Sequence, residues 1–194
     1  MSRLGDWRDA DEPVYQPAED SVLLLEHVRA RIDPTDLVID VGTGSGYLAA
    51  ALRADPGATV VGVDVNPHAC RQAAAAGVPV VRGDLVGPIA PNAVDAVVCN
   101  PPYLPTEAED ARADWMERAL DGGPSGRRVT NRLLDTVASV LAPDGRVYLL
   151  VSSLQDVDLV RERAVANEFT MAEIGRDESF PFETLSIHEL TTTD

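Results

Sequence analysis

Asn100, Pro101, Pro102 and Tyr103 are consecutive residues that together could hold a planar NH₂ group for reaction. An Asn side-chain oxygen and a prolyl carbonyl can accept both hydrogens of an amide or exocyclic amino group, which aims the nitrogen lone pair and stabilises developing positive charge. The prolines stiffen the loop, and Tyr103 offers a flat face for the acceptor. We predict that all four residues bind the substrate and that Asn100, Pro101 and Tyr103 are catalytic. An ordinary turn is the alternative interpretation.

A glycine-rich loop lies earlier in the chain, directly after an apolar stretch. It has the spacing Gly-x-Gly-x-Gly, beginning with Gly42 and Gly44, and Asp40 lies two residues before the first glycine. Glycines allow a tight turn and let a ligand approach the backbone closely. Asp64 ends the next apolar stretch, 22 residues after Gly42, where a carboxylate can bind ribose hydroxyls. The loop lacks the Lys-Ser/Thr pair of a phosphate-binding P-loop, so these residues predict a site for a nucleoside-containing cofactor.

Such a site could hold a dinucleotide or S-adenosylmethionine, and two further positions favour the second. Asp84 and Leu85 follow the third predicted strand, beside the expected adenine, and Asn100 follows the fourth and should also contact the cofactor. Together these positions resemble the seven-strand methyltransferase fold, which implies that Asp40 meets the methionine amino group and Asp64 the ribose. A sulfonium is a strong leaving group, so the protein would mainly orient the acceptor nitrogen. For Asp64 or Asp84 alone, a helix cap or turn residue is the alternative.

The elements that must position these residues follow from alternating apolar and helical stretches, the pattern of a βαβ fold. Strands are predicted at 37–41, 58–63, 78–81, 93–99, 146–151, 169–174 and 184–190, and helices at 18–32, 47–54, 67–76, 127–141 and 156–167. The last two strands, separated by Pro181, predict an antiparallel hairpin at the edge of a parallel sheet. The predicted fold is therefore α/β, with a seven-stranded, mostly parallel Rossmann-like sheet. The first helix is predicted to bury one face, formed by Val22, Leu25, Val28 and Ile32.

Length and composition favour one globular domain over residues 1–194, in which residues 1–35 form a segment and a helix that cover the cofactor site. Hydrophobic residues make up 45% of the chain, which is enough for a proper core. No apolar run approaches the ~18 residues of a membrane helix, and the acidic first residues lack a signal-peptide core, so we expect a cytosolic protein. Two cysteines without paired spacing and three scattered histidines predict neither a disulfide framework nor a metal site.

The chain is strongly acidic. It has 32 acidic residues against 16 basic ones, all of them arginine, and a net charge of −16. Such an excess repels phosphate backbones and disfavours a nucleic-acid partner. A soluble acidic surface would explain this composition, and so would adaptation to a salt-rich cytoplasm, where acidic surfaces that replace lysine are common. We favour the second explanation as a hypothesis.

Taken together, these motifs resemble the HemK family of protein glutamine methyltransferases, in particular its shorter archaeal and eukaryotic branch. The segment 15–21 is similar to the one that opens this branch, which implies that Pro17 and Ser21 contact the cofactor. Gln16 departs from the usual Glu in that segment. About 20 residues precede the first predicted helix, as expected for the short branch. The resemblance extends over nearly the whole chain, and the further matching stretches are 38–47, 61–67, 83–85, 100–103, Trp115, Gly122-Gly123, Gly126-Arg127 and 183–186.

The resemblance implies both a reaction and a partner. The implied reaction is S-adenosylmethionine-dependent methylation of the glutamine side-chain amide in the Gly-Gly-Gln motif of a class I translation release factor. The implied partner is a small zinc-binding activator protein that would form a heterodimer with this chain by covering an apolar edge. We expect it to dock on the third predicted strand, at 78–81, because an uncovered apolar strand edge tends to pair with other chains.

Other acceptors and another role are open at this point. The arrangement at 100–103 also serves adenine amino groups in DNA and adenine or guanine amino groups in RNA. The chain lacks an added recognition domain, however, and its best basic cluster is Arg127, Arg128 and Arg132. Protein lysine is a related acceptor, whereas a non-enzymatic cofactor-binding scaffold would not need Asn100 and Tyr103. The acidic stretch 106–114 is expected to be a solvated surface loop, with a substrate lid as the alternative.

Overall fold

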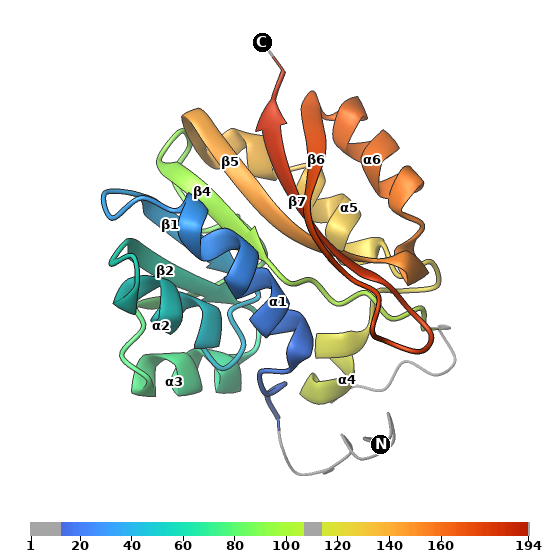
Figure 1. Ribbon diagram of the computed structural model, residues 1–194. Helices are drawn as coiled ribbons and strands as arrows, with labels where there is room; N and C mark the ends of the chain where they lie inside the picture. The colour runs from blue at the N-terminus through green and yellow to red at the C-terminus, as the bar shows by residue number, and fades with distance from the viewer. Residues whose placement is uncertain (1–12, 107–113, 194) are drawn as a thin grey trace.

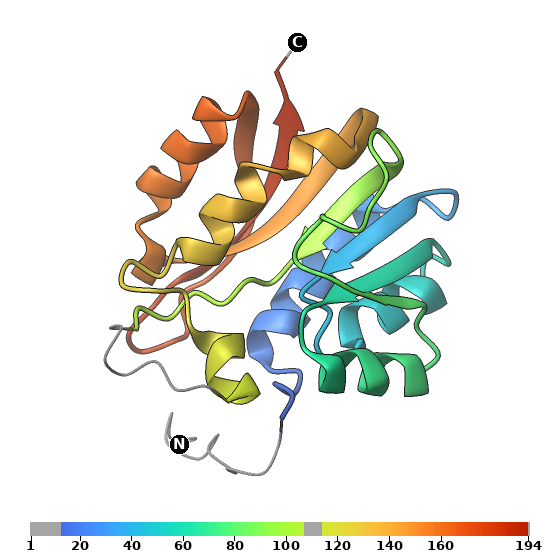
Figure 2. The same cartoon turned by 180° about the vertical axis from the view of Figure 1, so that it is seen from behind.

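A single sheet with helices on both faces makes up the part of the chain that the computed structural model describes, residues 13–106 and 114–193 (Figures 1 and 2). The strand order is β3-β2-β1-β4-β5-β7-β6. The predicted seven-stranded sheet is therefore confirmed. The strands are β1 (Leu37–Val41), β2 (Thr59–Asp64), β3 (Val80–Arg82), β4 (Val94–Cys99), β5 (Leu141–Ser152), β6 (Phe169–Asp177) and β7 (Leu185–Thr192).

The sheet is parallel from β3 to β5, and β7 pairs antiparallel with both β5 and β6. The predicted C-terminal hairpin is thus confirmed. Three helices, α1, α2 and α3, lie over one face of the sheet in Figure 1, and α5 and α6 lie over the other in Figure 2. The helices are α1 (Glu19–Val28), α2 (Tyr47–Ala54), α3 (Pro67–Ala75), α4 (Trp115–Leu120), α5 (Arg128–Leu134) and α6 (Val157–Ala166), with 3-10 turns η1 (Arg29–Arg31), η2 (Val137–Val140) and η3 (Ser153–Gln155).

The central strands are apolar along their whole length because both of their faces are covered. In β1, Val38 packs into the cluster beneath α1 and α2, whereas Ile39 and Val41 pack into the cluster beneath α5 and α6. In β4, Val98 and Cys99 divide between the two clusters in the same way. This double burial holds the carboxyl ends of β1 and β4 rigidly side by side, in the register Val41 opposite Cys99.

The buried face of α1 differs from the predicted one at its start. Val28 and Ile32 are buried, as predicted, and Leu25 is partly buried against the same cluster. Val22 was predicted to be buried but is 41% exposed. The reason is that Asp20 and Ser21 occupy the buried side of the first turn, where a prediction from apolar residues alone places no polar side chain.

The predicted helix at 127–141 is shorter in the structure. The α-helix α5 ends at Leu134, a 3-10 turn follows, and β5 begins at Leu141, before the predicted start at 146. The short helix α4 was not predicted at all. Its first turn is capped by Asp114, whose side chain accepts the Glu117 N–H at 2.8 Å. The rest of the acidic stretch 106–114, apart from Thr106, lies outside the described residues.

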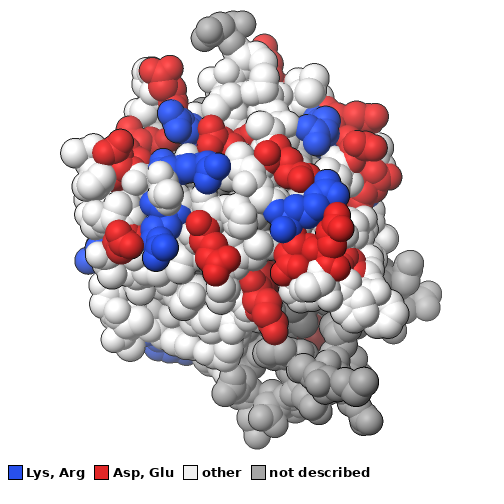
Figure 3. Space-filling model, in the orientation of Figure 1, with Lys and Arg blue, Asp and Glu red and all other residues white. Residues whose placement is uncertain are grey.

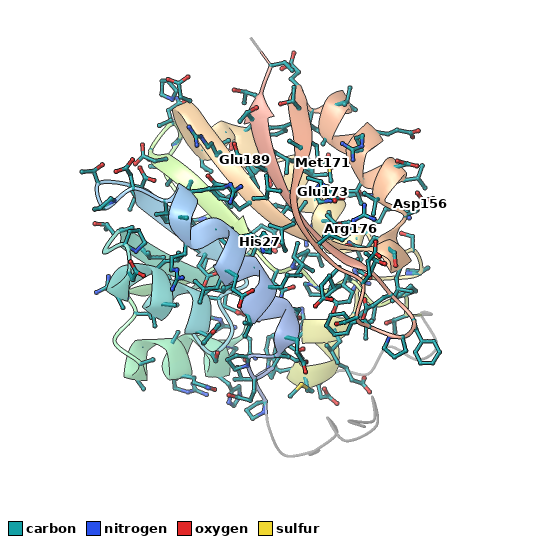
Figure 4. All side chains as sticks on the ribbon, viewed as in Figure 1. His27, Asp156, Met171, Glu173, Arg176 and Glu189 are labelled. Carbon is teal, nitrogen blue, oxygen red and sulfur yellow. The ribbon has the colours of Figure 1, made fainter. Side chains whose placement is uncertain are left out.

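At the far end of the sheet, β6 and β7 are held against α1 by a packing contact that needs a glycine. The pairing of β6 with β7 shifts register between Glu173 and Gly175. A side chain at Gly175 would collide with the ring of His27, which lies between α1 and this part of the sheet (Figure 4). On the same strand, the Arg176 guanidinium binds the Glu173 carboxylate, with Nη2 and Oε2 2.8 Å apart. These contacts fix the end of the sheet that carries the hairpin.

The other end of the sheet is the short strand β3, which pairs with β2. It is shorter than predicted, because residues 78–79 precede it as irregular backbone. Val81 on this strand and Val65 after β2 are both exposed. No helix in the described part of the chain is long and apolar enough to cross a membrane.

Candidate cofactor and acceptor site

The carboxyl ends of β1, β2 and β4 meet at a cavity of about 410 Å³. Segments from the N-terminal region, the glycine loop and helices α4 and α5 complete its wall. A smaller cavity of about 40 Å³ adjoins it and shares Asn100, Pro101 and Pro102 with it. The predicted site residues that line the large cavity are Pro17, Ser21, Gly42, Gly44, Asp64, Asp84, Leu85, Asn100, Pro101 and Pro102. Tyr103 lines the smaller one.

The glycine loop curls back over the end of β2. The backbone N–H groups of Gly42 and Thr43 both donate to the Val63 carbonyl, at 2.8 and 3.1 Å. Gly42 and Gly44 have φ values of +74° and +54°, a region that glycine enters without steric cost. The turn can therefore be tight enough to leave its backbone facing the cavity, as the sequence predicted.

Asp40 lies behind this loop and does not line either cavity. Its side chain is 1% exposed, and its Oδ2 accepts a hydrogen bond from Thr43 Oγ1 at 2.7 Å. Burial raises the pKa of this carboxyl to about 6, partly offset by the Thr43 bond. Asp40 Oδ1 has no hydrogen-bond partner among the described residues. A buried acceptor without a donor is costly, so this oxygen suits an ammonium group that it would reach through a water rather than by direct contact.

Asp64 holds the loop to the end of β2. Its Oδ2 accepts the Gly44 N–H at 2.9 Å, and its Oδ1 accepts the Asn66 N–H at 2.8 Å. Burial is the largest influence on this carboxyl and raises its pKa. The carboxylate thus lies at the cavity wall with its orientation fixed by two backbone donors, which is the geometry needed to present lone pairs to a ligand hydroxyl.

Asp84 and Leu85 form the opposite rim of the cavity. The Asp84 carboxylate pairs with Arg132 of α5, with Oδ2 and Nη2 2.6 Å apart, and both side chains are more than half exposed. Leu85 has a φ of +50°, a left-handed conformation that is uncommon for a leucine. Such strain concentrates at ligand sites, and both residues line the cavity.

Asn100 is held by α1. Its Nδ2 donates to Asp20 Oδ2 at 3.0 Å and to Ser21 Oγ at 3.4 Å. Because a carboxylate only accepts hydrogen bonds, the NH₂ side of the Asn100 amide must face Asp20, which leaves Oδ1 to accept from a ligand. Asp20 is itself buried and fixed, with its Oδ1 accepting the Ser21 N–H at 2.6 Å. Asp20 was not among the predicted site residues, although it lies in the segment 15–21 that resembles the opening of the family.

The loop that follows Asn100 packs closely against Gly126. Tyr103 is half-buried and packs against the cluster beneath α1. A Cβ at Gly126 would lie 2.5 Å from the Tyr103 carbonyl oxygen, so the backbone can approach only because residue 126 is glycine. The buried Gln155 side chain holds this turn, since its Nε2 donates to the Gly126 carbonyl at 2.9 Å and to Thr130 Oγ1 at 2.8 Å. Burial raises the pKa of Tyr103, which therefore keeps its phenolic proton.

Helices α4 and α5 bring side chains to the cavity that the sequence analysis did not assign to the cofactor. Trp115 and Arg118 line it from α4, and the Arg118 guanidinium lies 4.7 Å from the Trp115 ring centroid. Arg128 of α5 lines it while binding Asp121 at 2.7 Å. A guanidinium at this wall could neutralise an anionic ligand group. Within the described residues, no group of three or more His, Cys, Asp or Glu side chains could hold a metal ion.

Comparison with known proteins agrees with this geometry. Residues 18–177 match the methyltransferase small domain. The chain is 33% identical over 147 residues to a putative protein N5-glutamine methyltransferase of Methanocaldococcus jannaschii, a match that covers 73% of each protein. It is 35% identical over 157 residues to methyltransferase HEMK2 of Homo sapiens, covering 74% of this chain and 73% of that protein.

A solved structure is also similar over nearly the whole chain. It is the E. cuniculi complex of Mtq2 with Trm112, which is described as responsible for methylation of the translation termination factor eRF1. The match has a TM-score of 0.78 and 28% sequence identity and covers 94% of this chain and 100% of that one. The chain therefore belongs to the methyltransferase small domain family, among the HemK-like methyltransferases, and its methyl donor is S-adenosylmethionine.

Proposed function

We propose that this protein methylates the side-chain amide of the glutamine in the Gly-Gly-Gln motif of a class I translation release factor, giving N5-methylglutamine. The observation that carries the proposal is the orientation of Asn100. Its NH₂ group is occupied by Asp20 and Ser21, so its oxygen is the atom left to accept a hydrogen from an NH₂ acceptor. The names of the Methanocaldococcus relative and of the Mtq2 complex support glutamine and a termination factor as acceptor.

The proposed cofactor contacts assign each part of S-adenosylmethionine to particular residues of the site. Asp40 Oδ1 would bind the methionine ammonium through a water, because Asp40 is buried behind the loop, and Asp64 would bind the ribose hydroxyls. Asp84 and Leu85 would border the adenine, while Pro17 and Ser21 would cover the methionine part from the N-terminal side. S-adenosylmethionine supplies an electrophilic methyl group on a sulfonium, which is a good leaving group.

The proposed role of the chain in catalysis is to orient the acceptor and stabilise charge. Asn100 Oδ1 and the Pro101 carbonyl would accept the two amide hydrogens, with Pro102 stiffening the loop and Tyr103 lying against the planar amide. These contacts strengthen as positive charge develops on the nitrogen, which is why they favour the transition state. No base is needed until the methyl group has moved.

The charge of the molecule supports a protein acceptor over a nucleic acid. The net charge is −16, and on the face shown in Figure 3 arginines are interspersed with carboxylates without forming a basic tract. Two of the arginines that line the cavity already bind carboxylates, Arg128 with Asp121 and Arg132 with Asp84. The cavity wall therefore offers little positive charge to neutralise the phosphates of a DNA or RNA backbone.

We also propose that the chain works as a single domain, with the segment before β1 covering the cofactor, and as a heterodimer with a small zinc-binding activator. Of the predicted covering segment 1–35, residues 1–12 lie outside the described residues. The docking edge would be β3. Val65 and Val81 are exposed there, and β3 ends the sheet. An edge strand that pairs on one side only, with exposed valines on it and beside it, is suited to strand addition by a partner. The Mtq2 structure, a complex with Trm112, supports a partner of this kind.

Label transfer from S-adenosylmethionine tests the proposed function. The purified protein, with and without the activator, is offered an intact release factor, the same factor with its Gly-Gly-Gln glutamine replaced by alanine, or DNA. We expect label in the glutamine-containing peptide of the first substrate and in neither of the others. Label in the alanine-substituted factor or in DNA would contradict the proposal.

An Asn100→Ala variant tests the role of the clamp in the same assay. Turnover should fall by at least about 100-fold, because the amide acceptor loses an oriented hydrogen-bond partner in the transition state. The dissociation constant for S-adenosylmethionine should change by less than about threefold. Asn167→Ala is the matched control, since that amide binds Asp135 on the surface. Loss of cofactor binding in proportion to turnover would show that Asn100 serves the cofactor and not the acceptor.

A further inference from the structure

The turn between β6 and β7 exposes a phenylalanine that the core does not use. Phe182 is 81% exposed, the highest value for a large hydrophobic side chain in the described residues. Phe180, two residues earlier, packs against the cluster beneath α1. The turn can therefore partly bury one aromatic ring, yet it presents a second one to solvent, and an exposed aromatic of this kind marks interaction surfaces.

The backbone next to Phe182 is held in place. Glu183 Oε2 accepts a hydrogen bond at 2.6 Å from Ser152 Oγ, at the buried end of β5. The Thr184 carbonyl accepts the Ser153 N–H at 2.8 Å, and the Thr184 N–H donates to Ser153 Oγ at 3.0 Å. The ring is thus displayed from a fixed turn, so a partner would lose little conformational freedom of the turn on binding it.

Two exposed leucines lie on neighbouring elements. Leu154 belongs to η3, which is joined to the turn by the Ser153 and Thr184 bonds, and Leu159 lies in the first turns of α6, which contacts η3. We call Leu154, Leu159 and Phe182 the apolar corner. Val81 on β3 and Val65 after β2 are exposed, at the opposite end of the strand order from β6. The apolar corner is therefore separate from the edge proposed for the activator.

The apolar corner lies at the same edge of the sheet as the acceptor site. Ser152 ends β5, pairs with Leu185 at the start of β7, and β5 adjoins β4, whose end leads into Asn100. The Glu183 carboxylate is also near enough to be one of the charges that raise the pKa of Tyr103. Figures 1 and 2 show the β6–β7 turn at the same end of the molecule as α4, which lines the cofactor cavity.

We propose that the apolar corner binds the folded body of the protein acceptor, away from the residue that is methylated. This proposal rests on the proposed function. Carboxylates lie close in sequence to the residues of the corner: Asp156 caps the start of α6, and Glu178 and Glu183 lie on either side of Phe182 in the turn, where Glu178 also binds Arg176. The matching surface is an apolar recess with a basic rim on a protein; a phosphate backbone is excluded by the same carboxylates. Docking here would add affinity that a short peptide in the cavity cannot gain.

The test compares an intact release factor with a short peptide that carries its Gly-Gly-Gln motif, using the protein with its activator. Phe182→Ser should raise KM for the intact factor about tenfold or more, with kcat and the KM for the peptide unchanged. Val165→Ser is the matched control, because Val165 is an exposed hydrophobic on α6 outside the corner. The dissociation constant of the intact factor, measured separately, should shift as KM does.

The possible outcomes separate the two proposals. If the wild-type protein methylates neither substrate, the proposed function fails. If the wild-type protein methylates the factor and Phe182→Ser leaves both its KM and its dissociation constant unchanged, the docking inference fails alone. An equal loss on peptide and intact factor, or an equal effect of Val165→Ser, would also overturn it, because neither would be specific to docking at Phe182.

Discussion

At the scale of single residues, the site depends on which way one amide points. Asn100 could present either its oxygen or its NH₂ group to the acceptor, and only the oxygen can accept an amide hydrogen. The choice is made by Asp20, a buried carboxylate on α1 that accepts the Asn100 Nδ2–H at 3.0 Å. Asp20 is therefore a positioning residue, acting on the substrate through Asn100.

An Asp20→Asn variant tests this orientation. The new amide can still accept the Ser21 N–H, but its own NH₂ would face that of Asn100, so Asn100 would turn over and present donors to the acceptor. We expect kcat to fall about 10- to 100-fold, the value of one hydrogen bond to a charged group, with the dissociation constant of S-adenosylmethionine within about threefold.

The control for this change is Asp135→Asn, which weakens a surface pair with Arg163 and should leave kcat unaltered. An Asp20→Asn variant with full kcat would show that Asn100 keeps its orientation without the carboxylate. A fall in cofactor affinity that matches the fall in kcat would instead place Asp20 at the cofactor.

At the scale of elements, the loop from Asn100 to Tyr103, here called the acceptor loop, is supported by the glycine-containing turn at 122–126, which packs against it. The segment after Tyr103 pairs with the end of α4 through Leu104, which accepts the Gly122 N–H at 2.9 Å. Gly126 has a φ of +70° and lies against the Tyr103 carbonyl. Gln155 of η3 ties this turn to the end of β5. The glycine signature near 122–126 thus has a structural reason, namely close approach to the acceptor loop.

A Gly126→Ala variant should therefore combine backbone strain with a collision. We expect the free energy of unfolding to fall by about 2–4 kcal/mol and kcat to fall with it, because Tyr103 must move. Gly77→Ala is the matched control. Gly77 has a φ of +82° but no atom within 4 Å of an added Cβ, so it should show the strain alone, about 1 kcal/mol, with kcat retained.

Denaturant unfolding and steady-state kinetics of the two variants provide the measurements. If Gly126→Ala were no less stable than Gly77→Ala, the packing of the turn on Tyr103 would not contribute to stability. Equal kcat values in the two variants would show that the turn does not position the acceptor loop.

At the scale of the whole molecule, the dominant feature is net negative charge. A chain with a formal charge of −16 repels itself in the folded state, and added salt screens that repulsion. We propose that the protein is adapted to a salt-rich cytoplasm. Surface pairs such as Arg163 with Asp135 and Arg176 with Glu173 do not offset the excess, because exposed pairs contribute little.

Thermal melting at increasing potassium chloride concentration tests this adaptation. We expect the melting temperature to rise from about 0.1 M to above about 1 M salt, where the Debye length falls from roughly 10 Å to 3 Å. Sucrose at matched water activity is the control for effects of solvent exclusion without charge screening. A melting temperature that is highest at low salt would contradict adaptation to a salt-rich interior.

The sequence by itself determined the succession of strands along the chain, the glycine loop, the acid that ends β2 and the acid after β3, and the segment Asn100 to Tyr103. These are local features: strand and helix periods, turn residues and strand ends depend on neighbours within a few positions. The same reasoning failed for Val22, because the buried face of α1 is decided by what it packs against.

Only the tertiary structure decided which side chain orients Asn100, why residue 126 must be glycine, and that Phe182 stays exposed beside a partly buried Phe180. Asp20 and Asn100 are 80 positions apart, and Gly126 packs against Tyr103 although helix α4 lies between them in the sequence. Such contacts depend on how α1 crosses the sheet and how the ends of β4, β5 and β7 align. Packing between distant segments sets these positions, and no local pattern in the chain encodes them.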